Sequence, residues 1–155
     1  MRLVIQRVSS ASVCVNNKII ASISKGMLIL VGFETADGIE GIDKICGKIS
    51  RLRIFTDANG VMNLSNTDID GEYLVVSQFT LHAETAKGNR PSYIKAARPE
   101  QAIPLYEHFL KSLSEVANKK VQSGEFGADM QVALVNDGPV TIIIDTLEKI
   151  KTTDY

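Results

Sequence analysis

The sequence predicts a single α+β domain in which a curved, mostly antiparallel β-sheet, or partial barrel, carries two helices. Three observations predict this class. Short runs rich in Val and Ile alternate with turn residues, two longer stretches repeat apolar residues every three or four positions, and no linker or internal repeat divides the chain. At 155 residues the chain is long enough to bury a core without disulfides or a structural metal.

Three strands are expected first. Residues 3–15 and 18–23 are typical of a hairpin that turns at Asn16-Asn17. Residues 27–33 are apolar on both faces of a strand, which indicates a central position in the sheet.

A helix is predicted next, with Asp37 as its N-cap. Its apolar stripe would consist of Ile39, Ile42, Ile45, Ile49 and Leu52. A short strand over residues 53–56 and a turn over residues 57–60 should follow.

The middle of the chain predicts a strand over residues 72–79 and then a polar, irregular segment over residues 82–98. Long irregular segments are uncommon unless they are functional. A second helix should begin near Pro99 and end at Lys119-Lys120, which suits the helix dipole. Its buried stripe would consist of Ala102, Leu105, Phe109, Leu113 and Val116.

The last part of the chain predicts a connector over residues 124–130 and two strands, 131–135 and 140–144, on either side of Gly138-Pro139. The domain would therefore cover residues 1–146. Residues 147–155 form a polar tail to which we assign no function.

Composition excludes several function classes. The net charge of −1 argues against broad, non-specific binding of nucleic acid, although a local basic patch stays possible. Cys14 and Cys46 stand far apart and are expected to be reduced, half-buried thiols, and no ligand spacing predicts a metal or another cofactor. No signal peptide and no membrane-spanning apolar run is present, so a cytoplasmic protein that does not bind membranes is expected.

Two polar strings at the ends of apolar strands indicate where a site lies. Ser77-Gln78-Phe79-Thr80-Leu81 follows one strand, and Asn136-Asp137-Gly138-Pro139-Val140-Thr141 follows another. The hydroxyl groups of Ser77 and Thr80 have no base beside them in sequence, and such a hydroxyl is a weak nucleophile. A site that holds its substrate with backbone N–H groups and polar side chains fits better. Gly138-Pro139 is either a simple connecting turn or a fixed, exposed pair of carbonyls in the cis or the trans form.

Three further features allow a structural or a functional interpretation. Lys87, Arg90, Lys95 and Arg98 surround Tyr93 in a loop that is either solvated or a contact for phosphate and ribose. We expect His82 to be a solvated loop residue, and His108, on the second helix, to be a residue of the surface or of the boundary between surface and core rather than a ligand.

Several of these motifs, in order, resemble the D-aminoacyl-tRNA deacylase (D-Tyr-tRNA deacylase) family over residues 1–145. The resemblance rests on Gln6-Arg7-Val8, Ala11-Ser12-Val13, Arg53-Ile54-Phe55, Ser77 to Leu81, Lys87 to Ser92, Ala128 to Val132, and Asn136 to Thr141. It implies a hydrolase that cleaves the ester between a D-amino acid and the terminal adenosine of tRNA, so that mischarged tRNA is recycled, and that also removes glycine from wrongly charged tRNA.

The resemblance also implies the roles of residues. Ser77, Gln78, Phe79 and Thr80 would surround the terminal adenosine and the ester, with the N–H groups of Phe79 and Thr80 holding the substrate and Gln78 orienting it. The 2′-OH of the tRNA would assist attack by water, in place of a base from the protein.

Chiral selection would come from a second set of residues, in a homodimer with sites at the subunit interface. Gly138 and Pro139, joined by a cis bond, would reach into the site of the other subunit and occupy the place of an L side chain. Arg7 would hold this element, and Met130 would pack on the adenine. Without the resemblance, Arg7 would be a surface cation and Met130 core filler.

Two alternatives stay open. Thr80 is a candidate covalent nucleophile. The second alternative is that the chain forms a non-catalytic, β-rich dimer that binds RNA ends or a nucleotide, in which Gly138-Pro139 serves dimer assembly alone.

Overall fold

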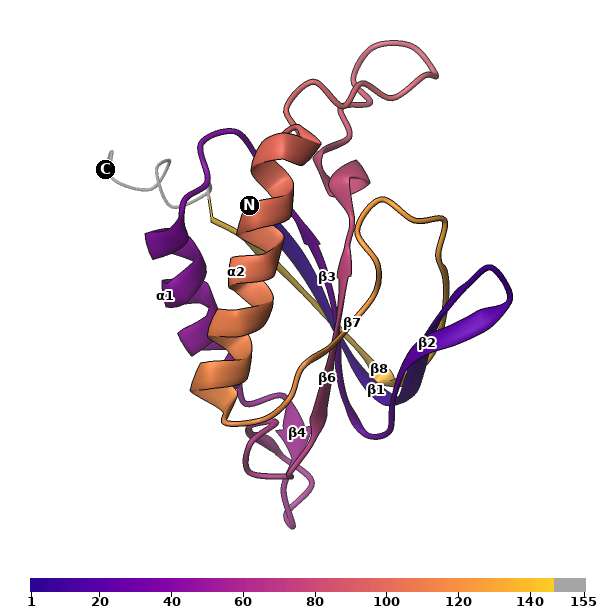
Figure 1. The fold of residues 1–155 in the computed structure, drawn as a ribbon. Helices are drawn as coiled ribbons and strands as arrows, with labels where there is room; N and C mark the ends of the chain where they lie inside the picture. Colours follow the sequence, from indigo (N-terminus) through magenta and orange to yellow (C-terminus); the bar gives the residue numbers. More distant parts are fainter. Residues whose placement is uncertain (147–155) are drawn as a thin grey trace.

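The computed structural model describes residues 1–146 of the chain. Two α-helices lie on one face of a strongly curved sheet (Figure 1). The elements in order are β1 (Arg2–Val15), β2 (Lys18–Ile23), β3 (Gly26–Gly32), α1 (Ile39–Ser50), β4 (Phe55–Thr56), β5 (Met62–Leu64), β6 (Glu72–Ser77), the 3₁₀ helix η1 (Phe79–His82), α2 (Pro99–Ala117), β7 (Gln122–Ser123) and β8 (Gln131–Asp145).

The main sheet is mixed, and its strand order is β2-β1-β3-β6-β7, with β8 on the other edge of β1. β1 is antiparallel to β2, β3 and β8, whereas β6 runs parallel to β3 and β7 runs parallel to β6. β4 and β5 form a separate small hairpin. The predicted α+β class with a curved sheet and two helices is confirmed.

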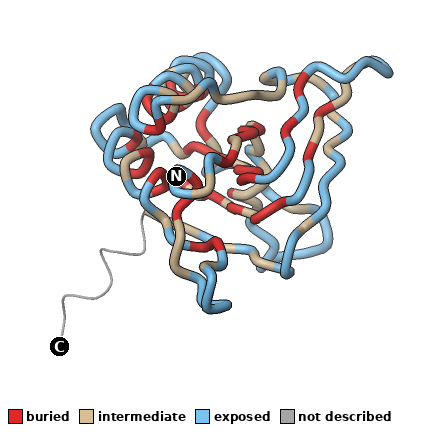
Figure 2. The backbone as a smooth tube through the Cα atoms, turned by 90° about the horizontal axis from the view of Figure 1, so that it is seen from below, coloured by how far each residue is buried: buried red, intermediate tan, exposed pale blue. Residues whose placement is uncertain are grey.

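The curvature of the sheet creates two buried clusters. β3 contributes to both, since Ile29 faces the helices and Leu28 lies in the cluster on the other side. This double burial confirms that the strand is central. Buried positions concentrate where the helices meet the sheet and along the strand centres (Figure 2). The cluster on the far side consists of Val8, Ala11, Val13, Ala21, Ile23, Leu28, Leu74 and Val76.

The first hairpin forms as predicted. Asn16 and Asn17 have φ values of 49° and 62°, which is the backbone conformation that a tight two-residue hairpin turn requires. Short polar side chains tolerate this region better than most others, so the sequence signal was local and sufficient.

The N-cap of the first helix lies one residue later than predicted. Its N-cap is Gly38, because the carboxylate of Asp37 is occupied elsewhere. Asp37 accepts a hydrogen bond from the amino group of Met1 at 2.6 Å and another from the backbone N–H of Glu34 at 2.7 Å. Ile39 at its start is exposed, and Leu52 lies beyond its end at Ser50.

The second helix begins at Pro99 as predicted but ends earlier than expected. Asn118 closes it with a left-handed conformation, and Lys119 lies beyond the helix, where it pairs with Asp70 at 2.7 Å. Val116 is exposed rather than part of the buried stripe, because Leu113 is followed on that face by Ala117.

The last two predicted strands are one strand, β8. Gln6 of β1 pairs with Thr141 and Val8 pairs with Asn136, so residues 137–140 form a bulge opposite Arg7. Gly138-Pro139 therefore does not reverse the chain. β5 and β7 were not predicted, because strands of three and two residues carry no readable pattern.

Further expectations concern single residues and the tail. Both cysteines are free, and burial raises the pKa of the Cys46 thiol to about 12, whereas Cys14 is half-buried.

Among residues 1–146, no group of three or more His, Cys, Asp or Glu residues is placed to hold a metal ion. No helix in that range is long and apolar enough to cross a membrane. The predicted polar tail, 147–155, lies outside the described residues.

Replacement of Phe109 tests the importance of the helix-side core. Phe109 is fully buried on α2 and meets Phe33 edge to face, with ring centroids 6.5 Å apart. We expect Phe109→Ala to lower the free energy of unfolding by about 3–5 kcal/mol, because it removes buried surface and leaves a cavity. Urea denaturation measures the change. Val61→Ala, at an exposed position, should change it by less than about 0.5 kcal/mol; equal effects of the two substitutions would contradict the assignment.

Candidate active site

The first polar string lies where strand β6 ends. Ser77 is the last residue of β6 and pairs with Val31, and the N–H of Gln78 donates to the carbonyl of Val31 at 2.8 Å. The chain then turns into η1, and the Gln78 side-chain amide donates to the hydroxyl of Thr80. The first N–H groups of a helix find no partner inside it, and those of Phe79 and Thr80 occupy this position. This end of the strand therefore presents an amide, two hydroxyls and backbone donors.

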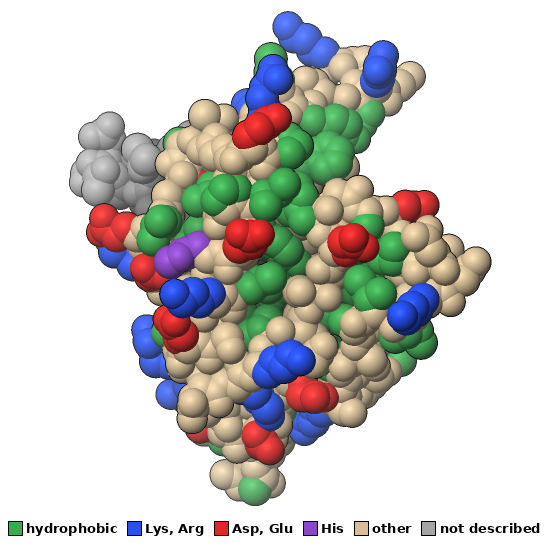
Figure 3. Space-filling view, in the orientation of Figure 1, with side chains coloured by type: hydrophobic (Ala, Val, Ile, Leu, Met, Phe, Trp, Pro, Cys, Tyr) green, Lys and Arg blue, Asp and Glu red, His purple; other side chains and the backbone are tan. Residues whose placement is uncertain are grey.

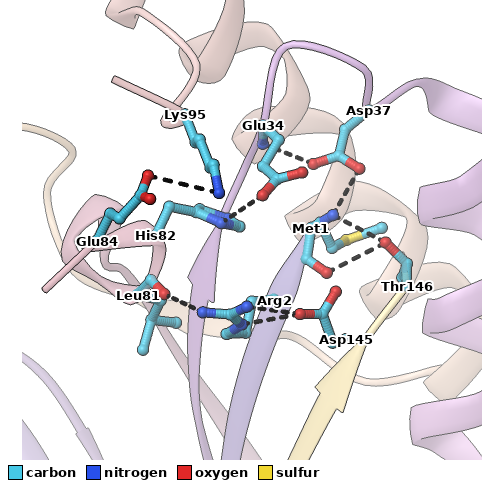
Figure 4. Close-up of polar contacts among 10 residues, drawn as sticks. All are labelled: Met1, Arg2, Glu34, Asp37, Leu81, His82, Glu84, Lys95, Asp145 and Thr146. Atoms are coloured by element: carbon cyan, nitrogen blue, oxygen red, sulfur yellow. Dashed lines mark hydrogen bonds and ion pairs between the residues drawn. The ribbon is translucent and has the colours of Figure 1, made fainter. Parts of the chain in front are cut away.

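Two polar contacts, one part-buried and one buried, fix η1 from opposite sides (Figure 4). Arg2, at the start of β1, donates from Nη1 to the carbonyl of Leu81 at 2.6 Å. The same guanidinium is held by Asp145 at the end of β8, at 2.7 Å. On the other side, His82 Nδ1 lies 2.9 Å from Glu34 Oε1. η1 is thus tied to both β1 and the loop that follows β3.

His82 was predicted to be a solvated loop residue, and this prediction is wrong. Only 4% of His82 is exposed, and its ring lies against Gly32 at the end of β3. A Cβ atom at Gly32 would stand 2.7 Å from the carbonyl oxygen of Gln78 and 3.1 Å from the His82 ring. Glycine at position 32 therefore makes room for η1. The sequence held one hint, since His82 directly follows the polar string.

A second polar cluster joins the helices but lacks the geometry of a nucleophilic site. His108 Nε2 and the Ser112 hydroxyl both contact Asp43 Oδ1, at 2.7 and 2.8 Å. Hydrogen bonds from Ser112 and His108 hold the pKa of Asp43 below its usual value. Because both groups bind the same carboxylate oxygen, His108 does not serve as a base for Ser112. His108, in the middle of α2, is half-buried at the boundary between core and surface, as predicted.

The second polar string forms the bulge of β8, and Arg7 holds it. The buried guanidinium of Arg7 donates from Nε to the carbonyl of Asp137 at 2.9 Å and from Nη1 to that of Ile54 at 2.8 Å. Gly138 has a φ of 138°, and the peptide bond between Gly138 and Pro139 is cis. Both residues are exposed, so the bulge presents backbone and little side chain to its surroundings.

The predicted site residues do not all meet within one chain. Ser77 pairs with Val31 of β3, which in turn pairs with Leu3 of β1. Gly138-Pro139 instead lie opposite Arg7 of β1. Four residues of β1 separate Leu3 from Arg7, which is roughly 13 Å along the strand. Two further strands lie between β8 and β6. The two strings are therefore too far apart to contact one small group in the same chain.

Met130 lies apart from both strings. It is half-buried and packs against the apolar cluster on the far side of the sheet, beside Gly124. The next residue, Gln131, pairs with Cys14 near the far end of β1. Within one chain, Met130 thus contributes to packing, and its expected contact with adenine stays a prediction.

Removal of the His82 side chain tests whether it fixes η1. We expect His82→Ala to lower the free energy of unfolding by about 2–4 kcal/mol, since it empties a buried position and leaves Glu34 without its partner. Backbone amides of residues 78–83 should also exchange hydrogen faster. Denaturation and hydrogen-exchange mass spectrometry measure the two effects. His108→Ala is the matched control and should leave exchange at η1 unchanged; unchanged exchange in His82→Ala would refute the role.

Comparison with known proteins gives a consistent result. The profile of the family described as D-Tyr-tRNA(Tyr) deacylase matches residues 4–145. The D-aminoacyl-tRNA deacylase of Flavobacterium johnsoniae is 62% identical, over 94% of this chain and 97% of its own length. Those of Bacteroides fragilis and Porphyromonas gingivalis are 62% and 64% identical, over 96% of this chain and 99% of theirs.

Solved structures are similar as well. One of a protein described as c-Myc DNA Unwinding Element Binding Protein has a TM-score of 0.89 and 39% identity, over 94% of this chain and 99% of that one. One of a probable eukaryotic D-amino acid tRNA deacylase has a TM-score of 0.80 and 17% identity, over 92% and 97%, and shows likeness of fold. The resemblance drawn from the motifs is confirmed. The chain belongs to the D-Tyr-tRNA(Tyr) deacylase family, a family of hydrolases.

Proposed function

We propose that this protein hydrolyses the ester of D-aminoacyl-tRNA, at the 3′ end, to free tRNA and a D-amino acid, without a metal or another cofactor. The observation that carries the proposal is the polar string Ser77 to Thr80, held rigidly at the end of β6 in a chain of this family. Fixed amide and backbone donors stabilise the charge that develops on an ester carbonyl during hydrolysis. By removing mischarged amino acids, the protein would proofread translation in the cytoplasm.

The substrate itself supplies the missing base. Gln78 donates a hydrogen bond to the Thr80 hydroxyl and so does not take its proton. His82 is buried and engaged with Glu34. Neither Gln78 nor His82 therefore activates a nucleophile. We therefore assign activation of the attacking water to the neighbouring 2′-OH of the terminal ribose. Phe79 and Thr80 would hold the substrate through their N–H groups, Gln78 would orient it, and Ser77 would line the site.

Chiral selection would come from a second copy of the chain. β8 is an edge strand that exposes Val135 and Ile143 by 55% and 68% on either side of the bulge, and an exposed apolar edge of this kind favours pairing with another chain. In a homodimer, Gly138 and Pro139 would enter the site of the partner subunit. Their backbone would occupy the space of an L side chain, and Met130 would contact the adenine.

Such a filter has a chemical consequence for glycine. It rejects an L-amino acid because the L side chain clashes at one of the two substituent positions of the α-carbon, and glycine has a hydrogen atom at that position. Glycyl-tRNA would therefore pass the filter and be hydrolysed. Activity on wrongly charged glycyl-tRNA follows from the same exclusion that protects L-aminoacyl-tRNA.

A time course with purified protein tests the reaction and the role of the 2′-OH. We expect rapid release from D-Tyr-tRNA, release from Gly-tRNA, and none from L-Tyr-tRNA. D-Tyr esterified to a tRNA that ends in 2′-deoxyadenosine should react about 10²–10⁴-fold more slowly, since a general acid–base catalyst is lost. Thr80→Ala should retain activity within about tenfold, because its backbone N–H is kept.

Other outcomes lead to the alternatives. Loss of all activity in a folded Thr80→Ala protein, with the 2′-deoxy substrate still cleaved, would favour Thr80 as nucleophile. Binding of D-Tyr-tRNA without release would leave a non-catalytic protein that binds RNA ends.

Arg7 is expected to control chirality without taking part in hydrolysis. Arg7→Met removes the donors to Asp137 and Ile54 and frees the bulge. The preference for D-Tyr-tRNA over L-Tyr-tRNA should fall by at least about tenfold, while hydrolysis of the D ester changes little. Arg51→Met, at an exposed arginine, is the control. Sedimentation should show that both variants stay dimeric; an Arg7→Met dimer that still rejects the L ester would contradict the role.

A further inference from the structure

Residues 83–95, here called the arm, project beyond the end of the sheet next to the candidate site (Figure 1). The arm has a defined shape. Glu84 and Ser92 exchange two backbone hydrogen bonds of 2.8 and 3.0 Å, and Gly88 at its tip has a φ of 67°. At its base, the N–H of Ala97 donates to the carbonyl of Phe33 at 2.9 Å. The arm is therefore fixed to the same loop that holds His82.

The arm concentrates positive charge in a chain whose net charge is −1. Lys87, Arg90 and Lys95 are exposed on it, and Lys and Arg side chains gather over it in the space-filling view (Figure 3). Lys95 pairs with Glu84, the acidic residue of the arm, at 3.5 Å. Within residues 1–146, Lys87 and Arg90 have no ion pair. Two cations are thus left for an anionic partner.

An exposed aromatic pair joins the arm to η1. The rings of Phe79 and Tyr93 meet edge to face with centroids 5.1 Å apart, and 56% of Phe79 and 39% of Tyr93 stay exposed. A folded protein gains by burying such rings, so their exposure beside a polar site is informative. Exposed rings next to Lys and Arg are the usual platform for unpaired bases of RNA.

We infer that the arm binds the 3′-terminal strand of the RNA substrate, with Lys87 and Arg90 on its phosphates and the Phe79–Tyr93 pair stacked on a base near the ester. The inference rests on the proposed function and names how its substrate is held. Four residues from Glu84 to the tip at Gly88 reach at most roughly 13 Å when extended, which corresponds to a few nucleotides at about 3.4 Å each. A short stretch of RNA is thus long enough to reach from the base of the arm to its cations.

Kinetics with a whole and a minimal substrate test the inference. The substrates are D-Tyr-tRNA and D-tyrosyl-adenosine, which keeps the ester and its ribose but lacks the RNA strand. We expect Lys87→Gln/Arg90→Gln to raise KM for D-Tyr-tRNA about tenfold with kcat within twofold. The slope of log(kcat/KM) against log salt should become shallower by about 1.4–1.8, because two phosphates are no longer neutralised by the protein. Reaction of D-tyrosyl-adenosine should not change.

Matched variants separate charge and stacking from other effects. Lys18→Gln/Lys120→Gln removes two exposed lysines elsewhere and should leave both KM and the salt slope unchanged. Tyr93→Ala should raise KM for D-Tyr-tRNA at least about fivefold, whereas Tyr93→Phe keeps the ring and should behave as the unaltered protein.

Each remaining outcome has one meaning. Unchanged KM and salt slope in the arm variant would overturn the inference while the proposed function stands. Equal loss on both substrates in Lys87→Gln/Arg90→Gln would also overturn it, because the cations of the arm would then act through the fold of η1. Failure of the unaltered protein to hydrolyse either ester would instead overturn the proposed function.

Discussion

Strand β1 is the element on which the rest of the structure depends, because three strands within residues 1–146 hydrogen-bond to it. One edge carries β8 along almost its whole length. The other edge carries β3 as far as Val8 and β2 from Ala11 onward. Since a strand has two edges, this change of neighbour forces the sheet to curl over itself, and the curl produces one apolar cluster under the helices and another on the far side.

The same strand positions both polar strings. Arg2 and Arg7 lie five residues apart on β1, and each donates to a main-chain carbonyl, Leu81 in one case and Asp137 in the other. A guanidinium with several fixed donors is suited to this task, because one group satisfies carbonyls from separate segments. The two halves of the proposed site are therefore held by one rigid element, even though they do not meet in one chain. A homodimer would bring each half to its counterpart.

Local signals accounted for what the sequence predicted well. The hairpin at Asn16-Asn17, the two helices and the central strand each followed from neighbouring residues, and the two polar strings indicated the candidate site. Errors arose where a distant residue decided the outcome. Asp37 is not a cap because Met1 occupies it, and His82 is buried because Glu34, far away in sequence, lies beside it. The continuity of β8 depends on β1, which no pattern near Pro139 records.

The close approach at Gly32 has a consequence for the way this sequence is able to vary. Position 32 lies in one strand and His82 at the end of a separate segment, yet the missing side chain of one provides the room for the ring of the other. A larger residue at position 32 is tolerated only together with a smaller residue at position 82 and a shifted turn. The shift would displace Thr80, two residues away. A glycine that the structure constrains tightly near the site thus lies outside the recognised motif, and substitution at an ordinary strand position is limited by the reaction.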